Sequence, residues 1–174
     1  MPPTLPQQIR LFISYRSQDP DLSLAQRFYE ALEAAGYESF MAGESIRLGE
    51  NWAQRVDEEL ERADYFLLLL SPKSAASEMV TEEVRRAKEL RDRHPNHKPV
   101  ILPIRVNFPW DSPLNYDLRG YLNRIQQREW KTEADTPKIL QEILTLLAAG
   151  SPSPPTPPEA DEADPPPPPY PLIL

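Results

Sequence analysis

A six-residue run of large apolar side chains, Tyr65–Leu70, is the feature that most constrains the fold. A run without polar alternation is typical of a strand that is buried on both faces of its sheet. Such a strand needs a layer of helices on each side, and strands alternate with helical patterns between residues 9 and 150. We therefore expect an α/β fold, a flavodoxin-like doubly wound sheet of five parallel strands with helices on both faces.

Local signals predict where several of these elements begin and end. The other predicted strands cover residues 9–15, 37–40, 99–106 and 126–130. Asp19 followed by Pro20 predicts the start of the first helix, and Gly36 predicts its end. Asn51 is expected to cap the second helix. Pro103 interrupts the strand at residues 99–106, which argues for a bulge or an edge there.

The helix predicted from Ser77 carries an acid in an unusual place. At about 100° per residue, Glu83 falls inside an apolar arc, whereas Glu82 falls on the opposite side. The apolar members of that arc are Met79, Val80, Val84, Ala87 and Leu90. A carboxylate among apolar neighbours is costly unless it is paired or functional. Glu83 is therefore either a partly buried acid with an arginine or amide partner, or a site residue at the end of a central strand, where such sheets bind ligands.

Composition excludes several classes of function. The formal net charge is −8, and neither the folded part nor the tail is basic, so a nucleic-acid partner is not expected. Cysteine is absent, which excludes disulfides and thiolate metal sites and fits a reducing compartment. No apolar run approaches about 20 residues, and the first residues lack the apolar core of a signal peptide. We expect a cytoplasmic protein that neither spans nor binds a membrane.

The chain divides into three parts. Residues 1–8 are expected to be a flexible N-terminus, and residues 9–150 to be the folded domain. Residues 151–174 hold eleven of the 22 prolines together with four acids and no lysine or arginine. Such a segment cannot bury enough apolar surface to fold, so we expect a disordered linker that leads to a further, downstream module.

Common cofactor and catalytic signatures are absent from the sequence. No G-x-G-x-x-G or G-x-x-x-x-G-K-[ST] motif follows a predicted strand, so a dinucleotide is not held in the Rossmann manner. A phosphoacceptor receiver domain would have the same topology, but its third strand should end in an aspartate, and here Leu70 is followed by Ser71 and Pro72. His94 and His97 have no partners at metal-ligand spacing, so no metal is expected.

Four stretches, taken together, resemble the Toll/interleukin-1 receptor (TIR) domain family, of bacterial type. Residues 12–19 (FISYRSQD) resemble the first box of the family, and residues 43–52 (GESIRLGENW) resemble its BB loop, with Leu48 in place of the usual proline. Residues 69–72 (LLSP) and 77–79 (SEM) resemble the L-S-x…S-E-W stretch, with Met79 in place of tryptophan. Glu83 lies four residues further on, where members that cleave NAD⁺ have their essential glutamate.

The resemblance implies an enzyme that cleaves the nicotinamide–ribose bond of NAD⁺, a glycohydrolase or cyclase, in a bacterial immune or signalling pathway. NAD⁺ is the substrate, and no separate cofactor is implied. Glu83 would be the catalytic residue, because a carboxylate stabilises the positive charge that develops on the ribose ring. The residues expected to bind substrate are Tyr15, Arg16, Ser17, Ser71 and Met79. For Arg16 the alternative is a solvated loop cation.

The resemblance also implies a second function, as a non-enzymatic module that assembles with other TIR domains through the BB loop. Ile46 is the expected apolar contact of that loop, unless it is an ordinary buried anchor. The residues expected to mediate self-association are Glu44, Ser45, Ile46, Arg47, Leu48 and Gly49. The two functions are compatible, because family enzymes often need self-assembly to complete their site.

Overall fold

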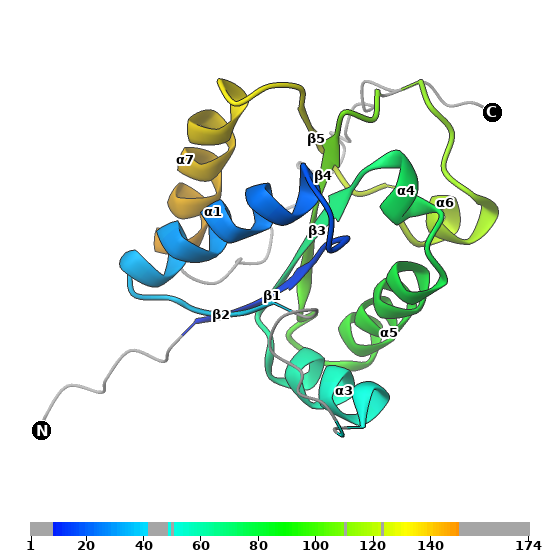
Figure 1. Cartoon of the computed structure of the whole chain (residues 1–174). Helices are drawn as coiled ribbons and strands as arrows, with labels where there is room; N and C mark the ends of the chain where they lie inside the picture. Colours follow the sequence, from blue (N-terminus) through cyan, green and yellow to red (C-terminus); the bar gives the residue numbers. More distant parts are fainter. Residues whose placement is uncertain (1–8, 42–48, 50, 110, 123, 150–174) are drawn as a thin grey trace, which may run out of the picture.

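One five-stranded parallel sheet runs through the chain and places its strands in the order β2-β1-β3-β4-β5 (Figure 1). The computed structural model describes residues 9–41, 49, 51–109, 111–122 and 124–149. The strands are β1 (Arg10–Ser14), β2 (Glu38–Met41), β3 (Tyr65–Leu70), β4 (Val100–Val106) and β5 (Arg128–Trp130). This order is that of the flavodoxin-like fold, so the predicted fold class is confirmed.

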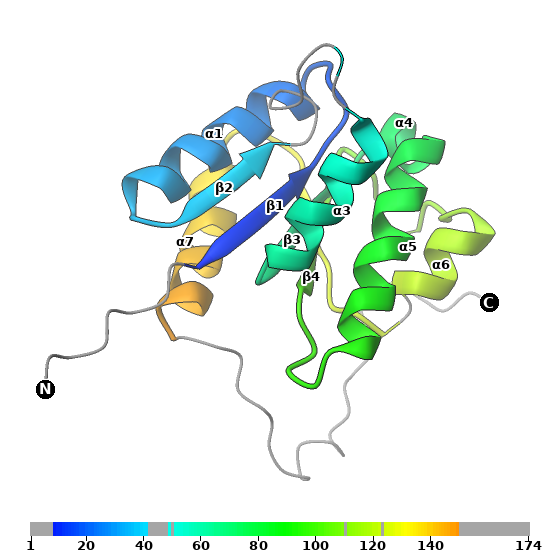
Figure 2. The same cartoon turned by 90° about the horizontal axis from the view of Figure 1, so that it is seen from below.

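Helices cover both faces of this sheet (Figure 2). One face carries α1 (Asp21–Ala34) and α7 (Asp135–Ala148). The other face carries α3 (Trp52–Arg62), α4 (Pro72–Ala75), α5 (Glu78–Arg93) and α6 (Tyr116–Leu122). None of the helices in the described part of the chain is long and apolar enough to cross a membrane.

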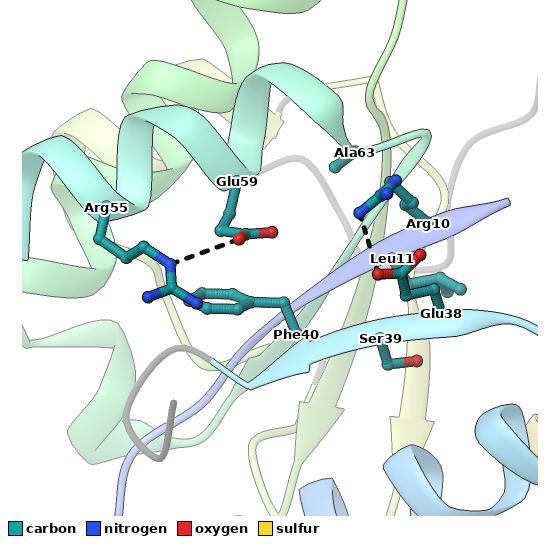
Figure 3. Close-up of a pocket in the computed structure, with 8 residues that line it drawn as sticks. All are labelled: Arg10, Leu11, Glu38, Ser39, Phe40, Arg55, Glu59 and Ala63. Atoms are coloured by element: carbon teal, nitrogen blue, oxygen red, sulfur yellow. Dashed lines mark hydrogen bonds and ion pairs between the residues drawn. The ribbon is translucent and has the colours of Figure 1, made fainter. Parts of the chain in front are cut away.

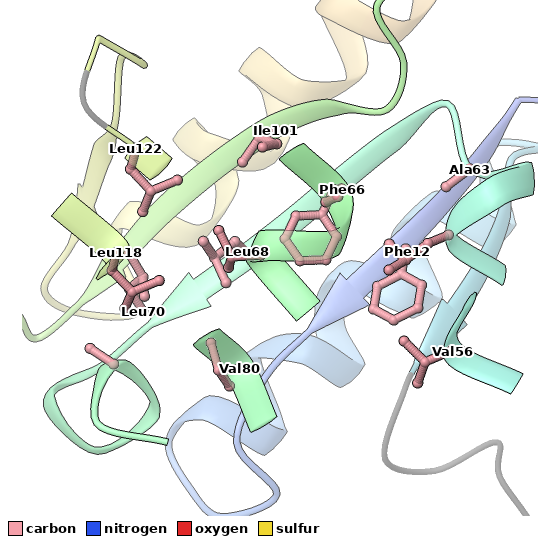
Figure 4. Packing of buried hydrophobic residues seen from close by; sticks show 14 of the residues in the cluster. Phe12, Val56, Ala63, Phe66, Leu68, Leu70, Val80, Ile101, Leu118 and Leu122 are labelled. Carbon is pink, nitrogen blue, oxygen red and sulfur yellow. The ribbon is translucent and has the colours of Figure 1, made fainter. Parts of the chain in front are cut away.

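Strand β3 lies at the centre of the sheet and is buried along its whole length. It pairs with β1 on one side and with β4 on the other. Phe66, Leu68 and Leu70 point into the cluster beneath α3, α5 and α6 (Figure 4). Tyr65, Leu67 and Leu69 point into the cluster beneath α1 and α7. The fully apolar run therefore predicts its environment correctly, because each successive side chain meets a hydrophobic layer.

Several predicted end signals act as expected. The Asn51 side chain caps α3 by accepting a hydrogen bond from the backbone nitrogen of Gln54 at 3.0 Å. Gly36 follows α1 with a φ of +98°, a backbone conformation that glycine adopts without strain. Pro103 lies opposite Leu68 of β3, one residue before the pairing of β4 with β5 begins. At Pro103 the strand is therefore an edge, which is where a proline is tolerated.

Three local predictions were wrong. Helix α1 begins at Asp21, two residues after the expected Asp19 cap, although the Asp19 carboxylate still accepts a hydrogen bond from the Ser23 nitrogen at 3.1 Å. A further short helix, α4, lies between β3 and the helix predicted from Ser77, in a stretch where the sequence predicts only a serine-rich turn. Met79 does not join the buried arc of α5, since it is 51 % exposed. Burial on α5 begins at Val80, and at about 100° per residue Met79 falls beyond the edge of the arc that the buried residues form.

Some predictions concern segments that lie outside the described residues. These are the flexible N-terminus at residues 1–8, most of the BB loop (residues 43–48 and 50), and the proline-rich linker at residues 151–174.

The central packing leads to a first testable prediction. Phe66 has no exposed surface, and its ring lies 5.4 Å from that of Phe12, centroid to centroid. Replacement by alanine leaves a cavity, so Phe66→Ala should lower the free energy of unfolding by about 3–5 kcal/mol. Urea denaturation followed by circular dichroism measures this change. Tyr116→Ala is the control, because Tyr116 is 81 % exposed and its loss should change stability by no more than about 0.5 kcal/mol. Similar losses in both variants would contradict this assignment of the core.

Candidate active site

The candidate site lies where the carboxyl ends of β1 and β3 meet the beginning of α5. In a parallel sheet these strand ends lie at one edge, which is where open α/β folds bind ligands. β1 ends at Ser14, and β3 ends at Leu70, with Ser71 following directly. Phe12 and Ser14 are two residues apart and so face the same side of β1, the side that α5 covers. Ser14 is thereby directed at the helix that carries Glu83.

Glu83 is a buried acid with a single side-chain partner in the described part of the chain. It is 4 % exposed, and the Ser14 hydroxyl donates a hydrogen bond to its Oε1 atom at 2.6 Å. Ser14 itself is completely buried. The second oxygen, Oε2, has no hydrogen-bond partner among the described residues. The carboxyl group is thus hydrogen-bonded at one oxygen, and its other oxygen is left without a partner in the described part of the chain.

Burial dominates the acidity of this group. It raises the pKa of Glu83 from 4.5 to about 7, and the hydrogen bond from Ser14 partly opposes that rise. Desolvation destabilises the carboxylate relative to the neutral acid, whereas a hydroxyl donor stabilises the carboxylate. Glu83 can therefore exist in both protonation states near neutral pH.

A second carboxyl–hydroxyl pair lies at the same end of the sheet. The Ser71 hydroxyl donates to Oδ2 of Asp21 at 2.6 Å, and Asp21 is 1 % exposed. Burial raises the pKa of Asp21, while the Ser71 hydrogen bond and the charge of Arg16 act in the opposite direction. The Ser71 oxygen also accepts from the Ser74 nitrogen at 3.1 Å, as part of the capping box of α4. This pair joins the start of α1 to the end of β3.

The structure brings some of the predicted site residues near Glu83 and separates others from it. Met79 is on the same side of α5, one turn before Glu83, and is exposed. Tyr15 is buried in the cluster beneath α1 and α7, on the opposite face of the sheet. Arg16 is half-buried and donates to Oε1 of Gln18 at 2.6 Å, and Ser17 is exposed.

The expected self-association residues are largely outside the described part of the chain. Of the six, Glu44, Ser45, Ile46, Arg47 and Leu48 lie there. Gly49 is described, is exposed and has a φ of +90°.

Two polar residues of this region were missed by sequence reasoning. Ser14 lies inside the F-I-S-Y motif. It is two residues after the apolar Phe12, and alternate residues of a strand face the same side, so this spacing could have predicted that Ser14 faces α5. Asp21 is an acid in the first turn of a helix, which on its own predicts only a favourable interaction with the helix dipole. Its burial depends on Ser71, which is 50 residues away in sequence. No local pattern could have shown that contact.

A hollow of about 210 Å³ opens between α3 and the amino ends of β1 and β2 (Figure 3). Its charges are paired internally, Arg10 with Glu38 at 3.1 Å and Arg55 with Glu59 at 3.3 Å. Arg10 is the first residue of β1 and Ser14 the last, so the hollow lies roughly 13 Å along the strand from the Glu83 contact. It is therefore not part of the Glu83 site. In the described part of the chain, no three acidic or histidine side chains gather as a metal site requires.

The raised pKa of Glu83 leads to a prediction about stability. The pKa of Glu83 is about 7 in the folded protein and 4.5 in the unfolded chain. Protonation of Glu83 therefore favours the folded state, and this contribution to the free energy of unfolding is present at low pH and is lost as the pH rises from 4.5 through 7. Glu83→Gln removes the ionisation but keeps an acceptor for Ser14. At pH 8 this variant should be more stable than the wild type by up to about 3 kcal/mol, and at pH 4 the two should be similar.

Denaturant unfolding at the two pH values measures this difference. Glu82→Gln is the matched control, because Arg85 lowers the pKa of Glu82 and its replacement should give no gain at pH 8. An unchanged pH dependence in Glu83→Gln would show that Glu83 ionises at its ordinary pH in the folded protein.

Solved structures similar to this chain contain TIR domains. The TIR domains of the activated Roq1 resistosome that recognises the pathogen effector XopQ superpose with a TM-score of 0.65 and 15 % identity, over 80 % of this chain and 99 % of theirs. The TIR domain of the Toll-related receptor TRR-2 from Hydra magnipapillata gives a TM-score of 0.60 and 16 % identity, over 79 % of this chain and 97 % of that one.

A TIR-STING receptor from C. gigas in complex with 2′,3′-cGAMP gives a TM-score of 0.56 and 23 % identity, over 76 % of this chain and 38 % of the receptor. At these identities the similarity shows the fold alone. No curated protein sequence gives a significant match. Residues 11–144, more than half of the chain, match the model of the TIR_2 family, described as the TIR domain. The chain therefore belongs to the TIR domain family.

Proposed function

We propose that this TIR domain cleaves the bond between nicotinamide and ribose in NAD⁺. The observation that carries the proposal is the Glu83 carboxyl group, which is buried among apolar neighbours, is hydrogen-bonded at Oε1 by Ser14 and has no hydrogen-bond partner at Oε2 among the described residues. Glu83 occupies the position of the essential glutamate in family members with this activity. Burial also places the carboxylate in a region of low dielectric constant, where the field of a single charge is strongest.

The proposed chemistry needs one carboxylate and no metal. The C1′–N bond breaks, and both of its electrons go to the ring nitrogen, so nicotinamide leaves as a neutral molecule. Positive charge develops on the ribose, and the ionised Glu83 stabilises it. Water then forms the new C1′–O bond and loses a proton. In a cyclase, an atom of the ADP-ribose would take the place of that water.

The exposed Met79 and the half-buried Arg16 are the proposed substrate contacts. Met79 offers a thioether and an apolar surface one turn before Glu83. Arg16 follows the end of β1 and offers a guanidinium group that can bind a pyrophosphate. Ser71 is less suited to a substrate contact, because its hydroxyl proton is donated to Asp21. Tyr15 contributes as part of the buried support for the loop after β1.

Nicotinamide release from NAD⁺ tests the proposal. Purified protein should release nicotinamide, faster at high local concentration on beads than in dilute solution, because family enzymes often need self-assembly. Glu83→Gln should lower the rate by at least about 100-fold, since it removes the charge that stabilises the transition state. Glu82→Gln is the matched control; this neighbouring acid pairs with Arg85 and Arg86 at the surface, and its replacement should leave the rate within about twofold.

Release that persists in Glu83→Gln would remove Glu83 from the site. Absence of release from the wild type under both conditions would contradict the enzymatic proposal as a whole.

We also propose that the chain associates with other TIR domains, either together with catalysis or as an adaptor in its place. The similarity to the TIR domains of the Roq1 resistosome supports this proposal. The BB-loop residues, with Ile46 as the apolar contact, are the proposed interface.

Sedimentation velocity over a range of protein concentrations tests this interface. The wild type should show association that grows with concentration, and Ile46→Asp should weaken it at least tenfold, because a charge would have to be desolvated in the contact. Ile46→Val, which keeps the apolar character, is the control and should associate like the wild type. Equal association of the Asp variant would contradict a role for Ile46.

The same proposal places the reaction in a cytoplasmic immune or signalling pathway of bacterial type. The absence of cysteine fits a reducing compartment, where NAD⁺ is present.

A further inference from the structure

The contact between Ser14 and Glu83 is not required by the packing of either element. Ser14 ends β1, and α5 is fixed against the sheet by its apolar residues Val80, Val84, Ala87 and Leu90. A small apolar side chain at position 14 would satisfy the same packing. The hydroxyl group instead donates to Oε1 of Glu83 at 2.6 Å, a short distance typical of an O–H···O⁻ bond.

The surroundings give Glu83 no other support. Two effects shift the pKa of Glu83: burial raises it, and the hydrogen bond from Ser14 lowers it. No charged group in the described part of the chain contributes to the shift. On α5, Glu82 and Arg86 pair at the surface, where Asp57 of α3 joins them. Charged groups on the other elements around α5 either have partners of their own or face solvent. On α3, Arg55 pairs with Glu59, and on β4, Arg105 donates to Gln127 and Pro109. The charged side chains of the two short helices are exposed: Lys73 on α4, and Asp117 and Arg119 on α6.

We propose that Ser14 is a positioning residue for the proposed reaction, which fixes Oε1 of Glu83 so that Oε2 faces the ribose of the substrate. This inference rests on the proposed function. A glutamate side chain has three rotatable bonds, and a carboxylate whose position varies stabilises a developing charge poorly. One bond from a completely buried hydroxyl on a rigid strand restricts this freedom. Because the bond is to a charged acceptor, it also favours the ionised form that the reaction uses.

The first test measures Glu83 directly and needs no catalytic activity. ¹³C NMR of the glutamate carboxyl carbons follows the titration of Glu83 in the wild type, in Ser14→Ala and in Ser14→Thr. The wild-type midpoint should lie near pH 7, as its burial and hydrogen bond indicate. In Ser14→Ala the titration midpoint should be about one to two pH units higher, because the loss of a hydrogen bond to a charged group destabilises the carboxylate. Ser14→Thr keeps a hydroxyl group and should restore the wild-type midpoint.

The second test measures nicotinamide release as a function of pH. The reaction needs ionised Glu83, so kcat/KM of the wild type should fall as the pH falls through about 7. In Ser14→Ala this acid limb should move upward by the same amount, and kcat should fall about 10- to 100-fold with little change in KM. Ser74→Ala is the matched control: Ser74 is equally buried, but its hydroxyl donates to the Leu69 carbonyl, so its loss should affect stability alone.

The outcomes separate this inference from the proposed function. A shifted titration and a shifted acid limb in Ser14→Ala, both absent in Ser74→Ala, would support the positioning role. Wild-type activity with an unmoved limb in a folded Ser14→Ala protein would overturn the role of Ser14 and leave the proposed function intact. Absence of nicotinamide release from the wild type would overturn the proposed function and the positioning role with it.

Discussion

The burial of β3 on both faces is the constraint on which the rest of the structure depends. All six of its side chains are enclosed, and they point alternately into two separate hydrophobic clusters. Neither cluster can exist without its helices, so the strand requires α3, α5 and α6 on one face and α1 and α7 on the other. Because the neighbouring strands run parallel to β3, their carboxyl ends all reach one edge of the sheet. The position of the candidate site follows from this arrangement.

At that edge the protein buries two acids, and it stabilises each with one hydroxyl group. Ser14 donates to Glu83 on the α5 side, and Ser71 donates to Asp21 on the α1 side, both at 2.6 Å. A buried carboxyl without any donor would cost several kcal/mol. A single donor reduces this cost without removing it, which is why burial still raises the pKa of both acids. The Asp21 pair joins two elements, whereas Oε2 of Glu83 has no hydrogen-bond partner among the described residues.

Sequence patterns predicted the elements well and their precise ends less well. Hydrophobic periodicity and cap residues such as Asn51 depend on nearby positions, so they can be read without the fold. Met79 shows the limit of that reasoning. At about 100° per residue it lies at the edge of the apolar arc, and whether an edge position is buried depends on the neighbouring elements, which the local sequence does not specify. The short helix α4 was not predicted, because four residues are too few to show a helical repeat of apolar side chains.

The sequence by itself determined the fold class, the order of the elements and the presence of an acid on the apolar side of α5. Each of these follows from the local spacing of apolar and polar side chains along the chain. Only the tertiary structure decided which groups meet that acid. Ser14 and Glu83 are 69 residues apart, and Ser71 and Asp21 are 50 apart. Contacts over such separations arise from the pairing of β1 with β3 and from the packing of α1 and α5 on opposite faces of the sheet, and no local pattern contains that information.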